Sequence, residues 1–457
     1  MGVACEITLF GGVGEIGGNA VLIEDKKAGR RLLFDYGVNY RVFKRYFEFP
    51  FNPPRDHDEL IQLGAIPDPQ KIGRVDACFI THLHGDHYKY PAISSITNQL
   101  YLPDKRMLDI RLDYLNRHNR LYFELEKPSP DLRLNETTPG EYHDRFDVAT
   151  RACLHSTIAN SYALITDIGL IAYTGDFRLH GRECEKCERK DACGLYKIHE
   201  EYSLTSLIEE ISQRPKILIC EGTNLGRNPT PLTELKVENK LAHLIERCKG
   251  LVIIDAHPLD IERAVSIGRA CREVAVKTGV PRVWVVGEPQ LVSLIEGIHA
   301  EDWNEARDYY CIPEEFKQYT KLDWHIVSSE ELRRRPENFV LVAHTRLIRL
   351  IRDIKPPAGS LYILSHSEPQ EEEYEASFRR LKAWLSFFNV PSYKVHCSGH
   401  AYPLDLRDFL EEVRPEYLIP IHTEHPEMFT SIIPSETKLV IPGKGVPIRF
   451  DDEGRPL

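Results

Sequence analysis

The strongest constraint on this chain is a histidine-rich string that directly follows an apolar run. Residues 81–87 read THLHGDH, and residues 75–80 before them read VDACFI, which predicts a buried strand. Side chains two positions apart on an extended segment point the same way, so His82 and His84 are expected to converge on one cation. The chain is therefore expected to fold so that a strand ends at a metal site.

The second half of the string indicates a second cation. Gly85 permits a sharp turn, because it lacks a Cβ atom. That turn can aim Asp86 and His87 at a point close to the first cation. Imidazole suits zinc, and a mixed nitrogen and carboxylate set suits zinc, manganese or iron. The string predicts a two-metal site, and the alternative is a chance cluster of histidines on a solvated loop.

Length and composition bound the class of protein. The 457 residues are many for one domain and ample for two, and 42% hydrophobic and 28% charged residues are ordinary for a globular protein. A formal net charge of −11 argues against broad nonspecific coating of nucleic acid. It still allows a nucleic-acid substrate in a local basic cleft that contains metal ions.

Three observations predict a cytoplasmic protein without a membrane segment. No apolar run approaches the ~18 residues needed to span a bilayer. The first residues, MGVACE, have neither a basic segment nor a long apolar one, so no signal peptide is expected. The 11 cysteines are scattered, and several lie in apolar runs, which fits reduced, buried thiols better than disulfides.

Apolar runs also predict how the chain is organised. Over the first ~175 residues, short strand-like runs separated by turns with glycine predict antiparallel pairing. From 216 to 364, strand-like runs alternate with helix-like stretches, which predicts a parallel, doubly wound sheet. A long amphipathic helix at 371–388 and two βα units follow. The expected parts are 1–204 (first domain), 205–370 (inserted domain) and 371–457 (return to the first domain).

Two cations need more ligands than the string supplies. His155, Asp176 and His422 each follow a short apolar run, at the expected carboxyl end of a strand. Alone, each would be an ordinary surface or core residue, but beside the string they complete a ligand set. A carboxylate such as Asp176 can bridge two cations about 3.5–4 Å apart, which activates water and neutralises charge on a phosphoryl oxygen. Such a centre can hydrolyse phosphodiesters, thioesters or lactams.

Several segments together resemble the metallo-β-lactamase superfamily and, within it, the β-CASP nucleases of the ribonuclease J type. Besides THLHGDH, they are GGVGEIGGN at 11–19, HSTIANS at 155–161, YTGDF at 173–177, SGHA at 398–401 and PIH at 420–422. The resemblance implies an αββα metallo-β-lactamase sandwich with an inserted doubly wound β-CASP domain. This α/β fold agrees with the organisation expected from the apolar runs.

The resemblance also implies a role for each site residue. The first cation would be held by His82, His84 and His155, with Asp176 bridging, and the second by Asp86, His87 and His422. The implied catalytic residues are Asp86, His400, Glu221 and Asp35. Among them, His400 would protonate the leaving oxygen, Glu221 would orient an active-site histidine, and Asp35 would support the site from beneath. The implied substrate-binding residues are Ser398, Gly399, Ser365 and Ser367.

This sequence departs from the family pattern in three places. Gly85 stands where ribonuclease J commonly has an acidic residue. Residues 364–369 read LSHSEP where the family has a Gly-Ser-Gln-Gly phosphate segment, so 5′-monophosphate recognition and the exonuclease mode stay open. The family usually has a further carboxy-terminal domain, whereas this sequence stops at Leu457, and a homodimer that depends on that domain is left open.

A second metal site is expected in a charged insert after Asp176. Its candidate ligands are Cys184, Cys187, Cys193 and His199. Three thiolates and one imidazole would make a closed structural zinc site. An iron–sulfur cluster is an alternative, and so is a solvated loop with incidental cysteines.

The leading hypothesis is a ribonuclease with two divalent metal ions, zinc or else manganese, that acts on single-stranded RNA as a 5′–3′ exonuclease, an endonuclease or both. A histidine at position 422 is typical of RNA-processing members of the family, which favours RNA over DNA. The alternatives are a DNA nuclease of the same fold, a small-molecule hydrolase of thioesters or lactones, and a noncatalytic nucleic-acid-binding subunit. The small-molecule hydrolase would not need residues 205–370, and the noncatalytic subunit would be expected to have lost metal ligands.

Overall fold

A computed structural model describes most of the chain. The described residues are 2–48, 52–88, 95–118, 125, 127–180, 203–229, 231–297, 310–320, 324–366 and 372–457. They form two compact units: unit 1 comprises 1–179, 198–229 and 399–457, and unit 2 comprises 180–197 and 230–398. One unit is thus inserted into the other. Among the described residues, no helix is long and apolar enough to cross a membrane.

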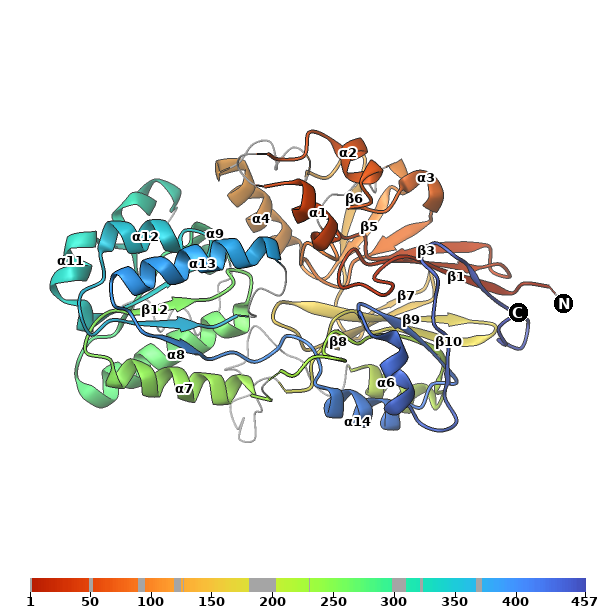
Figure 1. Cartoon of the computed structure of the whole chain (residues 1–457). Coiled ribbons are helices and arrows are strands. Elements are labelled where there is room, and N and C mark those ends of the chain that lie inside the picture. The colour runs from red at the N-terminus through yellow and green to blue at the C-terminus, as the bar shows by residue number, and fades with distance from the viewer. Residues whose placement is uncertain are drawn as a thin grey trace. The chain divides into compact units, whose positions relative to one another are not determined.

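Unit 1 contains two seven-stranded sheets (Figure 1). The first has the order β21-β1-β2-β3-β4-β5-β6. Its strands are β1 (Cys5–Gly11), β2 (Ala20–Asp25), β3 (Arg30–Phe34), β4 (Ala77–Phe79), β5 (Gln99–Leu102), β6 (Arg133–Glu136) and β21 (Ile448–Phe450). As expected, β1, β2 and β3 pair antiparallel. From β3 to β6 the pairing is parallel, because long connections and not tight turns join these strands.

The second sheet has the order β20-β19-β11-β10-β9-β8-β7. Its strands are β7 (Tyr142–His143), β8 (Val148–Cys153), β9 (Ala159–Thr166), β10 (Gly169–Tyr173), β11 (Pro215–Glu221), β19 (Tyr417–Ile421) and β20 (Lys438–Leu439). Strand β11 pairs with β10 and β19. The expectation that the run at 216–220 begins the inserted sheet is therefore wrong, and the first junction lies beyond residue 205. A fully buried parallel strand gives the same apolar run in either domain.

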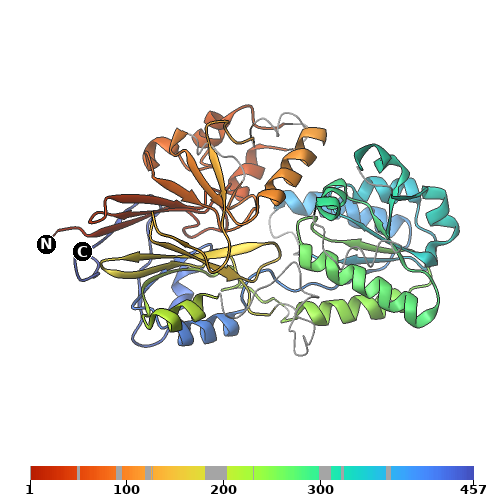
Figure 2. The same cartoon turned by 180° about the vertical axis from the view of Figure 1, so that it is seen from behind.

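Helices cover the outer faces of both sheets, and the sheets enclose a shared core (Figures 1 and 2). Residues such as Leu9, Phe34, Tyr173 and Ile219 form that core between the sheets. The helices beside the first sheet are α1 (Tyr40–Tyr46), α2 (His57–Gln62), α3 (Pro69–Ile72) and α4 (Lys105–His118). The helices α6 (Leu204–Ile211) and α14 (Pro403–Val413) pack on the second sheet. The 3-10 helix η6 (Pro426–Ser431) follows β19 in the chain. The unit is an αββα sandwich.

Unit 2 is built on a parallel sheet of seven strands in the order β15-β14-β13-β16-β12-β17-β18. Its strands are β12 (Val252–Asp255), β13 (Val283–Val286), β14 (Tyr310–Pro313), β15 (His325–Val327), β16 (Phe339–Ala343), β17 (Leu361–Leu364) and β18 (Ser392–Lys394). Every pair of neighbouring strands is parallel. The expected doubly wound arrangement is confirmed.

The helices of unit 2 lie on both faces of this sheet (Figure 1). On one face are α7 (Glu234–Arg247) and α8 (Ile261–Thr278), and on the other are α9 (Pro289–Gly297), α11 (Ser329–Arg334), α12 (Leu347–Ile354) and α13 (Glu372–Phe387). The 3-10 helices are η4 (Glu314–Tyr319) and η5 (Pro336–Asn338). Because β18 pairs with β17 and α13 packs in the same core, the second junction lies after residue 398 and not at 370.

Two helices of unit 2, α7 and α8, begin at residues that cap their first turns. Thr233 caps α7 by accepting a hydrogen bond from the Lys236 amide, and Asp260 caps α8 through the Arg263 amide. Gly279 ends α8 in the left-handed conformation, at φ 68°. Each of these helices therefore begins directly after its capping residue.

Candidate metal centre

The histidine string occupies the carboxyl end of β4, where the chain leaves the sheet. The Thr81 amide donates to Asp35 Oδ1 over 2.7 Å, which fixes the start of the string. The amides of His87 and Tyr88 both donate to the His84 carbonyl, at 3.0 and 2.7 Å, and close the turn. A Cβ atom on Gly85 would lie 1.8 Å from the Tyr40 hydroxyl oxygen. Glycine at this position therefore makes room for Tyr40.

The three expected ligands of the first cation lie together. The donor atoms of His82, His84 and His155 all lie within 4.8 Å of one another. His155 Nε2 is 3.1 Å from His84 Nδ1. The His82 and His84 rings are near perpendicular, at 78° with centroids 4.7 Å apart. Such rings can direct nitrogens to one point from different sides.

The four expected ligands of the second cation also lie together, and they come from three separate parts of the chain. Asp86, His87, Asp176 and His422 have donor atoms within 4.8 Å of one another. His87 Nε2 is 3.1 Å from Asp176 Oδ2, and His422 Nε2 is 3.1 Å from Asp86 Oδ2. Asp176 Oδ2 is also 3.9 Å from His82 Nε2 of the first set. Asp176 thus lies between the two sets, where a bridging carboxylate would be expected.

A second layer of contacts fixes which nitrogen of His155, His87 and His422 faces the centre. The Nδ1 atom of His155 contacts the Gly399 carbonyl at 2.6 Å, and that of His87 contacts Asp35 Oδ2 at 2.7 Å. The Nδ1 atom of His422 lies 2.7 Å from Thr223 Oγ1. These contacts leave Nε2 of each ring for the centre, as in histidine ligands of protein-bound metals.

The donor set fits divalent metal ions, because two of its buried atoms lack other partners. Among the described residues, His82 Nε2 and Asp176 Oδ1 are buried without a hydrogen-bond partner. A buried polar atom of this kind costs free energy unless a metal ion or a water molecule contacts it. Nitrogen and carboxylate donors suit zinc or manganese. The unit can thus hold divalent metal at this point.

The electrostatics of the centre keep most ligands in the form that binds metal. Burial lowers the pKa of His84 to about 4 and that of His82 well below its ordinary value, so both rings are neutral. Burial acts to raise the pKa of Asp176, but His422 and His87 outweigh it and lower this pKa. Burial acts to lower the pKa of His87, but Asp176 and Asp35 outweigh it and raise the pKa. Metal binding must therefore displace a proton from His87.

Asp35 supports the centre from beneath. Its carboxylate is fully buried and accepts hydrogen bonds from the Thr81 amide and hydroxyl, from Tyr173 Oη at 2.7 Å and from His87 Nδ1 at 2.7 Å. Its backbone is left-handed, at φ 60°, as is that of His422, at φ 53°. Such strained conformations persist where the surroundings hold them, and they cluster at functional sites.

Glu221, at the end of β11, connects two histidines of the site. His400 Nδ1 lies 3.3 Å from Glu221 Oε1. Thr223 Oγ1 donates to Glu221 Oε2 over 2.7 Å and lies 2.7 Å from His422 Nδ1. Burial acts to lower the pKa of His400, but Glu221 and Asp176 outweigh it and raise the pKa. Unit 1 thus holds, 3.7 Å from Asp176, a histidine whose protonated form Glu221 and Asp176 favour.

Residues beyond the expected set complete the centre. The backbone amide of Asn19 donates to the Asp86 carbonyl at 3.0 Å, and the side-chain nitrogen of Asn19 is 3.0 Å from His87 Nε2. Gly12 accepts from the His422 amide at 2.8 Å. The glycine-rich segment at 11–19 therefore supports Asp86 and His422. Asn19, Thr81 and Thr223 were not among the expected site residues, although each lies in or beside a motif used to predict the site.

The expected substrate-binding residues are more scattered. Gly399 contacts His155 through its carbonyl, whereas the Ser398 carbonyl, in unit 2, lies 2.9 Å from His180 Nε2. Ser365 is fully buried in unit 2, where its hydroxyl donates to the Val395 carbonyl and accepts from Arg263, both at 2.8 Å. The remaining expected sites lie outside the described residues: Ser367, Cys184, Cys187, Cys193 and His199.

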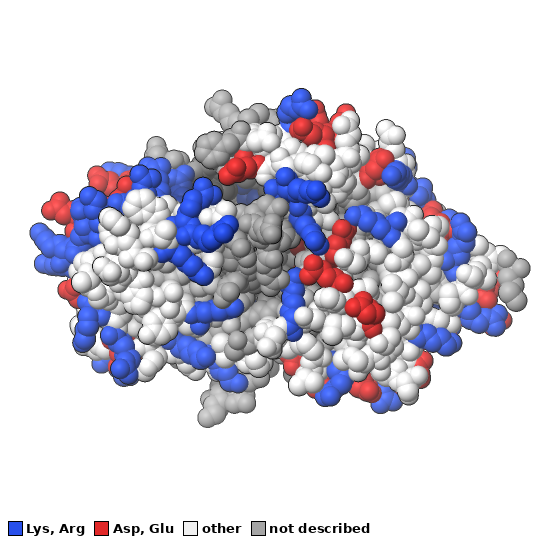
Figure 3. Space-filling view, viewed as in Figure 1, with Lys and Arg blue, Asp and Glu red and all other residues white. Residues whose placement is uncertain are grey.

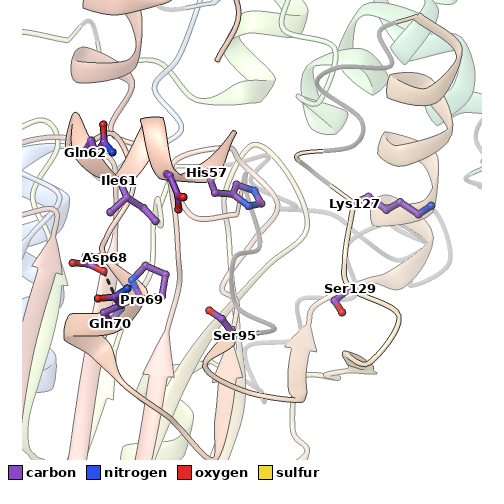
Figure 4. A pocket seen from close by; sticks show the side chains of 10 residues that line it. His57, Ile61, Gln62, Asp68, Pro69, Gln70, Ser95, Lys127 and Ser129 are labelled. Atoms are coloured by element: carbon purple, nitrogen blue, oxygen red, sulfur yellow. Dashed lines mark hydrogen bonds between the residues drawn. The ribbon is translucent and has the colours of Figure 1, made fainter. Parts of the chain in front are cut away.

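A cavity of 630 Å³ in unit 1 is separate from the metal centre, since no ligand residue lines it. Figure 4 shows His57 and Lys127 at its wall, with Gln70 below them, and their polar groups do not converge on one point. The chemistry of the unit therefore belongs to the histidine and aspartate sets and not to this cavity.

The known proteins that this chain is similar to include a family of zinc-dependent metallo-hydrolases. The family described as "RMMBL: Zn-dependent metallo-hydrolase RNA specificity domain" matches residues 392–430, which include His400 and His422. Ribonuclease J of Sinorhizobium meliloti is 24% identical over 455 residues, covering 94% of this chain and 72% of that protein. Ribonuclease J of Thermus thermophilus is 26% identical over 320 residues, covering 66% of this chain and 48% of that protein.

A third ribonuclease J and a solved structure are also similar to this chain. Ribonuclease J of Helicobacter pylori strain B128 is 23% identical, covering 92% of this chain and 56% of that protein. The chain thus spans between about half and three quarters of the length of these relatives. A crystal structure of a protein of unknown function from Enterococcus faecalis V583 aligns with a TM-score of 0.67 and 20% identity, over 98% of this chain and 100% of that one.

Fold and site together define a metal-dependent hydrolase with a metallo-β-lactamase sandwich and an inserted β-CASP unit, as the sequence predicted. Within that class the chain resembles ribonuclease J, and the similarities support a metal-dependent ribonuclease.

Proposed function

We propose that this chain hydrolyses phosphodiester bonds of single-stranded RNA at the centre in unit 1. The proposed ligands of two divalent cations, zinc or else manganese, are His82, His84, His155, Asp86, His87, His422 and the bridging Asp176. Cations held there would activate water and neutralise charge on the phosphoryl group. The similarity to ribonuclease J and the RNA specificity family supports RNA as the substrate.

The observation that carries the proposal is the connection between Glu221 and His400. A bare metal set serves many hydrolases, but cleaving a phosphodiester also requires a proton for the leaving oxygen. Glu221 contacts Nδ1 of His400 at 3.3 Å and helps to keep the ring protonated. Because Nδ1 faces the carboxylate, Nε2 is the atom that can face a substrate and donate. His400 is therefore proposed as the general acid and Glu221 as its positioning residue.

Arginines in unit 2 could contribute phosphate contacts. They are Arg333, Arg334, Arg346, Arg349 and Arg352, on or beside α11 and α12. Figure 3 shows Lys and Arg side chains over the end of the unit that carries these helices. Arg349 also pairs with Glu315 at 3.1 Å, and Arg352 lies over the Trp384 ring at 5.3 Å. Contacts with a phosphate backbone would make RNA binding weaker as salt rises.

The test compares cleavage of 5′-phosphorylated, 5′-hydroxyl and circular RNA with that of matched DNA. We expect RNA cleavage to fall at least ~100-fold in His400→Asn, within the range for loss of a general acid. His425→Asn is the matched control, because His425 Nδ1 also lies 3.3 Å from a carboxylate, that of Glu427, but it is exposed. Equal rates in the two variants would refute the role of His400.

The same assay distinguishes the remaining alternatives. Cleavage of the circle identifies endonuclease action, and a 5′-phosphate requirement identifies the exonuclease mode. Cleavage of DNA at the rate of RNA would favour the DNA nuclease. Hydrolysis of a thioester or lactone, without cleavage of either nucleic acid, would favour the small-molecule hydrolase. Light scattering of the same samples reports whether the chain is a homodimer.

A further inference from the structure

We propose that unit 2 binds one divalent transition-metal cation of the zinc class through Asp255, His344 and His366. This site shares no residue with the centre in unit 1 and does not depend on the proposed ribonuclease function. Its residues follow three neighbouring parallel strands: Asp255 ends β12, His344 follows β16, and His366 follows β17. Pairing of Asp255 with Ala343 and Leu364 brings the three together at the carboxyl edge of the sheet.

The three residues lie where chain connections leave adjacent strands toward opposite faces of the sheet. Helix α8 follows β12 and lies on one face of the sheet, while α12 follows the neighbouring β16 and lies on the other face (Figure 1). Chain connections that leave adjacent strands toward opposite faces leave a gap beyond the strand ends. In open α/β sheets, ligands bind at such a point.

The distances match those of a metal site. The donor atoms of the three residues lie within 4.8 Å of one another. His344 Nδ1 is 2.8 Å and His366 Nε2 is 3.1 Å from Asp255 Oδ1. Zinc–ligand bonds of about 2.0–2.1 Å at tetrahedral angles place donors about 3.3 Å apart. A small inward or outward movement of the side chains is enough to accommodate the ion.

The arrangement also repeats that of the centre in unit 1. The His344 and His366 rings have centroids 4.7 Å apart and an interplanar angle of 83°. The values for His82 and His84 are 4.7 Å and 78°. In both places, two imidazoles with crossed rings face the same point beside a buried carboxylate, which is the donor chemistry that zinc prefers.

Neighbouring residues hold the proposed ligands in place. Tyr362 Oη donates to Asp255 Oδ2 over 2.8 Å, so that Oδ1 is the oxygen directed at the histidines. The buried Glu288 accepts from the amide and the hydroxyl of Thr345, both at 3.0 Å, and fixes the loop next to His344. Outer contacts of this kind orient metal ligands.

Exposure indicates a site that a cation can enter. The Asp255 side chain is 5% exposed, whereas those of His344 and His366 are 29% and 20% exposed. Three ligands with one accessible side leave a fourth position for water or for an anionic group. His366 lies in the segment LSHSEP, where the family has Gly-Ser-Gln-Gly, so the site would be a feature of this chain's own sequence.

The test counts zinc per chain by mass spectrometry after equilibration at a buffered free zinc concentration. We expect His344→Gln and His366→Gln each to bind one zinc fewer than the wild type. His325→Gln, an exposed histidine on β15 of the same unit, should bind as many as the wild type. An unchanged count in both ligand variants, or an equal loss in the control, would refute the site.

A second measurement removes any dependence on the folding of those variants. In His82→Gln/His87→Gln, which disrupts the centre in unit 1, unit 2 should still bind one equivalent of Co²⁺ and give the visible absorption bands of a low-symmetry nitrogen and oxygen site. Adding His366→Gln should abolish the bands. A double variant that binds no Co²⁺, while its circular dichroism matches that of the wild type, would overturn the proposal.

Discussion

Replacing Asp35 with asparagine changes the chemistry of the centre without changing the shape of the side chain. The carboxylate accepts from the Thr81 amide through Oδ1, and from His87 and Tyr173 through Oδ2. An asparagine that keeps its oxygen toward Thr81 presents an NH₂ group to the other two. Asparagine also tolerates the left-handed backbone at φ 60°. The perturbation is therefore confined to His87 and Tyr173, because the Thr81 hydroxyl, 2.9 Å from Oδ2, also lies 3.1 Å from Oδ1 and can donate there.

The magnitude follows from these two donors. Tyr173 can rotate its hydroxyl and accept from the new amide. His87 can accept at Nδ1 only by moving its proton to Nε2, the atom directed at the centre. A metal ion at Nε2 rules out that arrangement and leaves the Nδ1 proton facing the NH₂ group without an acceptor, so we expect a 10–100-fold loss of metal affinity, the usual effect of removing an outer contact. This corresponds to about 1.4–2.8 kcal/mol.

The assay is a competition titration with a chromophoric zinc chelator, followed by RNA cleavage at the measured occupancy. Asp147→Asn is the matched control, because Asp147 also has a left-handed backbone, at φ 52°, and also accepts from a tyrosine, Tyr142, at 2.8 Å. Asp147 lies outside the centre, so this control variant should keep the metal affinity of the wild type. An affinity within twofold of the wild type in Asp35→Asn would refute the reasoning about the His87 proton.

The other predictions concern the protonation of His400, the hydroxyl of Thr223 and the reactivity of the cysteines. In Glu221→Gln, His400 loses a carboxylate that raises its pKa, so the protonated ring, and with it RNA cleavage, should disappear at lower pH than in the wild type. A pH–rate profile with an unmoved alkaline limb would contradict this prediction. Thr223→Val removes the hydroxyl between Glu221 and His422, and we expect cleavage to fall ~10-fold with a smaller change in KM. An unchanged kcat would contradict that role. Burial raises the pKa of Cys271 and Cys311 to about 12, and the eight described cysteines are all buried, with no disulfide between any two of them. Native protein should therefore react with a thiol reagent at no more than the three other cysteines of the 11. If Cys184, Cys187 and Cys193 hold a metal ion, their labelling should need a chelator, and rapid labelling without one would exclude that second site.

The expected ligands of the metal centre lie together in the structure because they stand at strand ends. His82 and His84 are two positions apart on an extended segment, and the remaining ligands follow apolar runs whose carboxyl ends meet in unit 1. Thr223 was harder to predict, because a threonine two residues after Glu221 has no spacing signal of its own. Its role follows only from contacts with Glu221 and His422, which β11 and β19 bring side by side.

Other features depend on strand pairing that a single sequence does not specify. The apolar run of β11 has the same pattern as the strands of unit 2, and only its pairing with β10 and β19 assigns it to unit 1. Asp255, His344 and His366 are too far apart in sequence to form a motif, and adjacent strands alone bring them together.

The most direct test of the account is RNA cleavage by wild type and Asp86→Ala before chelation, after chelation, and after Zn²⁺ or Mn²⁺ is restored. The account predicts that chelation abolishes cleavage by the wild type, that the restored metal recovers it, and that Asp86→Ala is inactive in every condition. Full activity of Asp86→Ala, or cleavage by the wild type that survives complete metal removal, would contradict it.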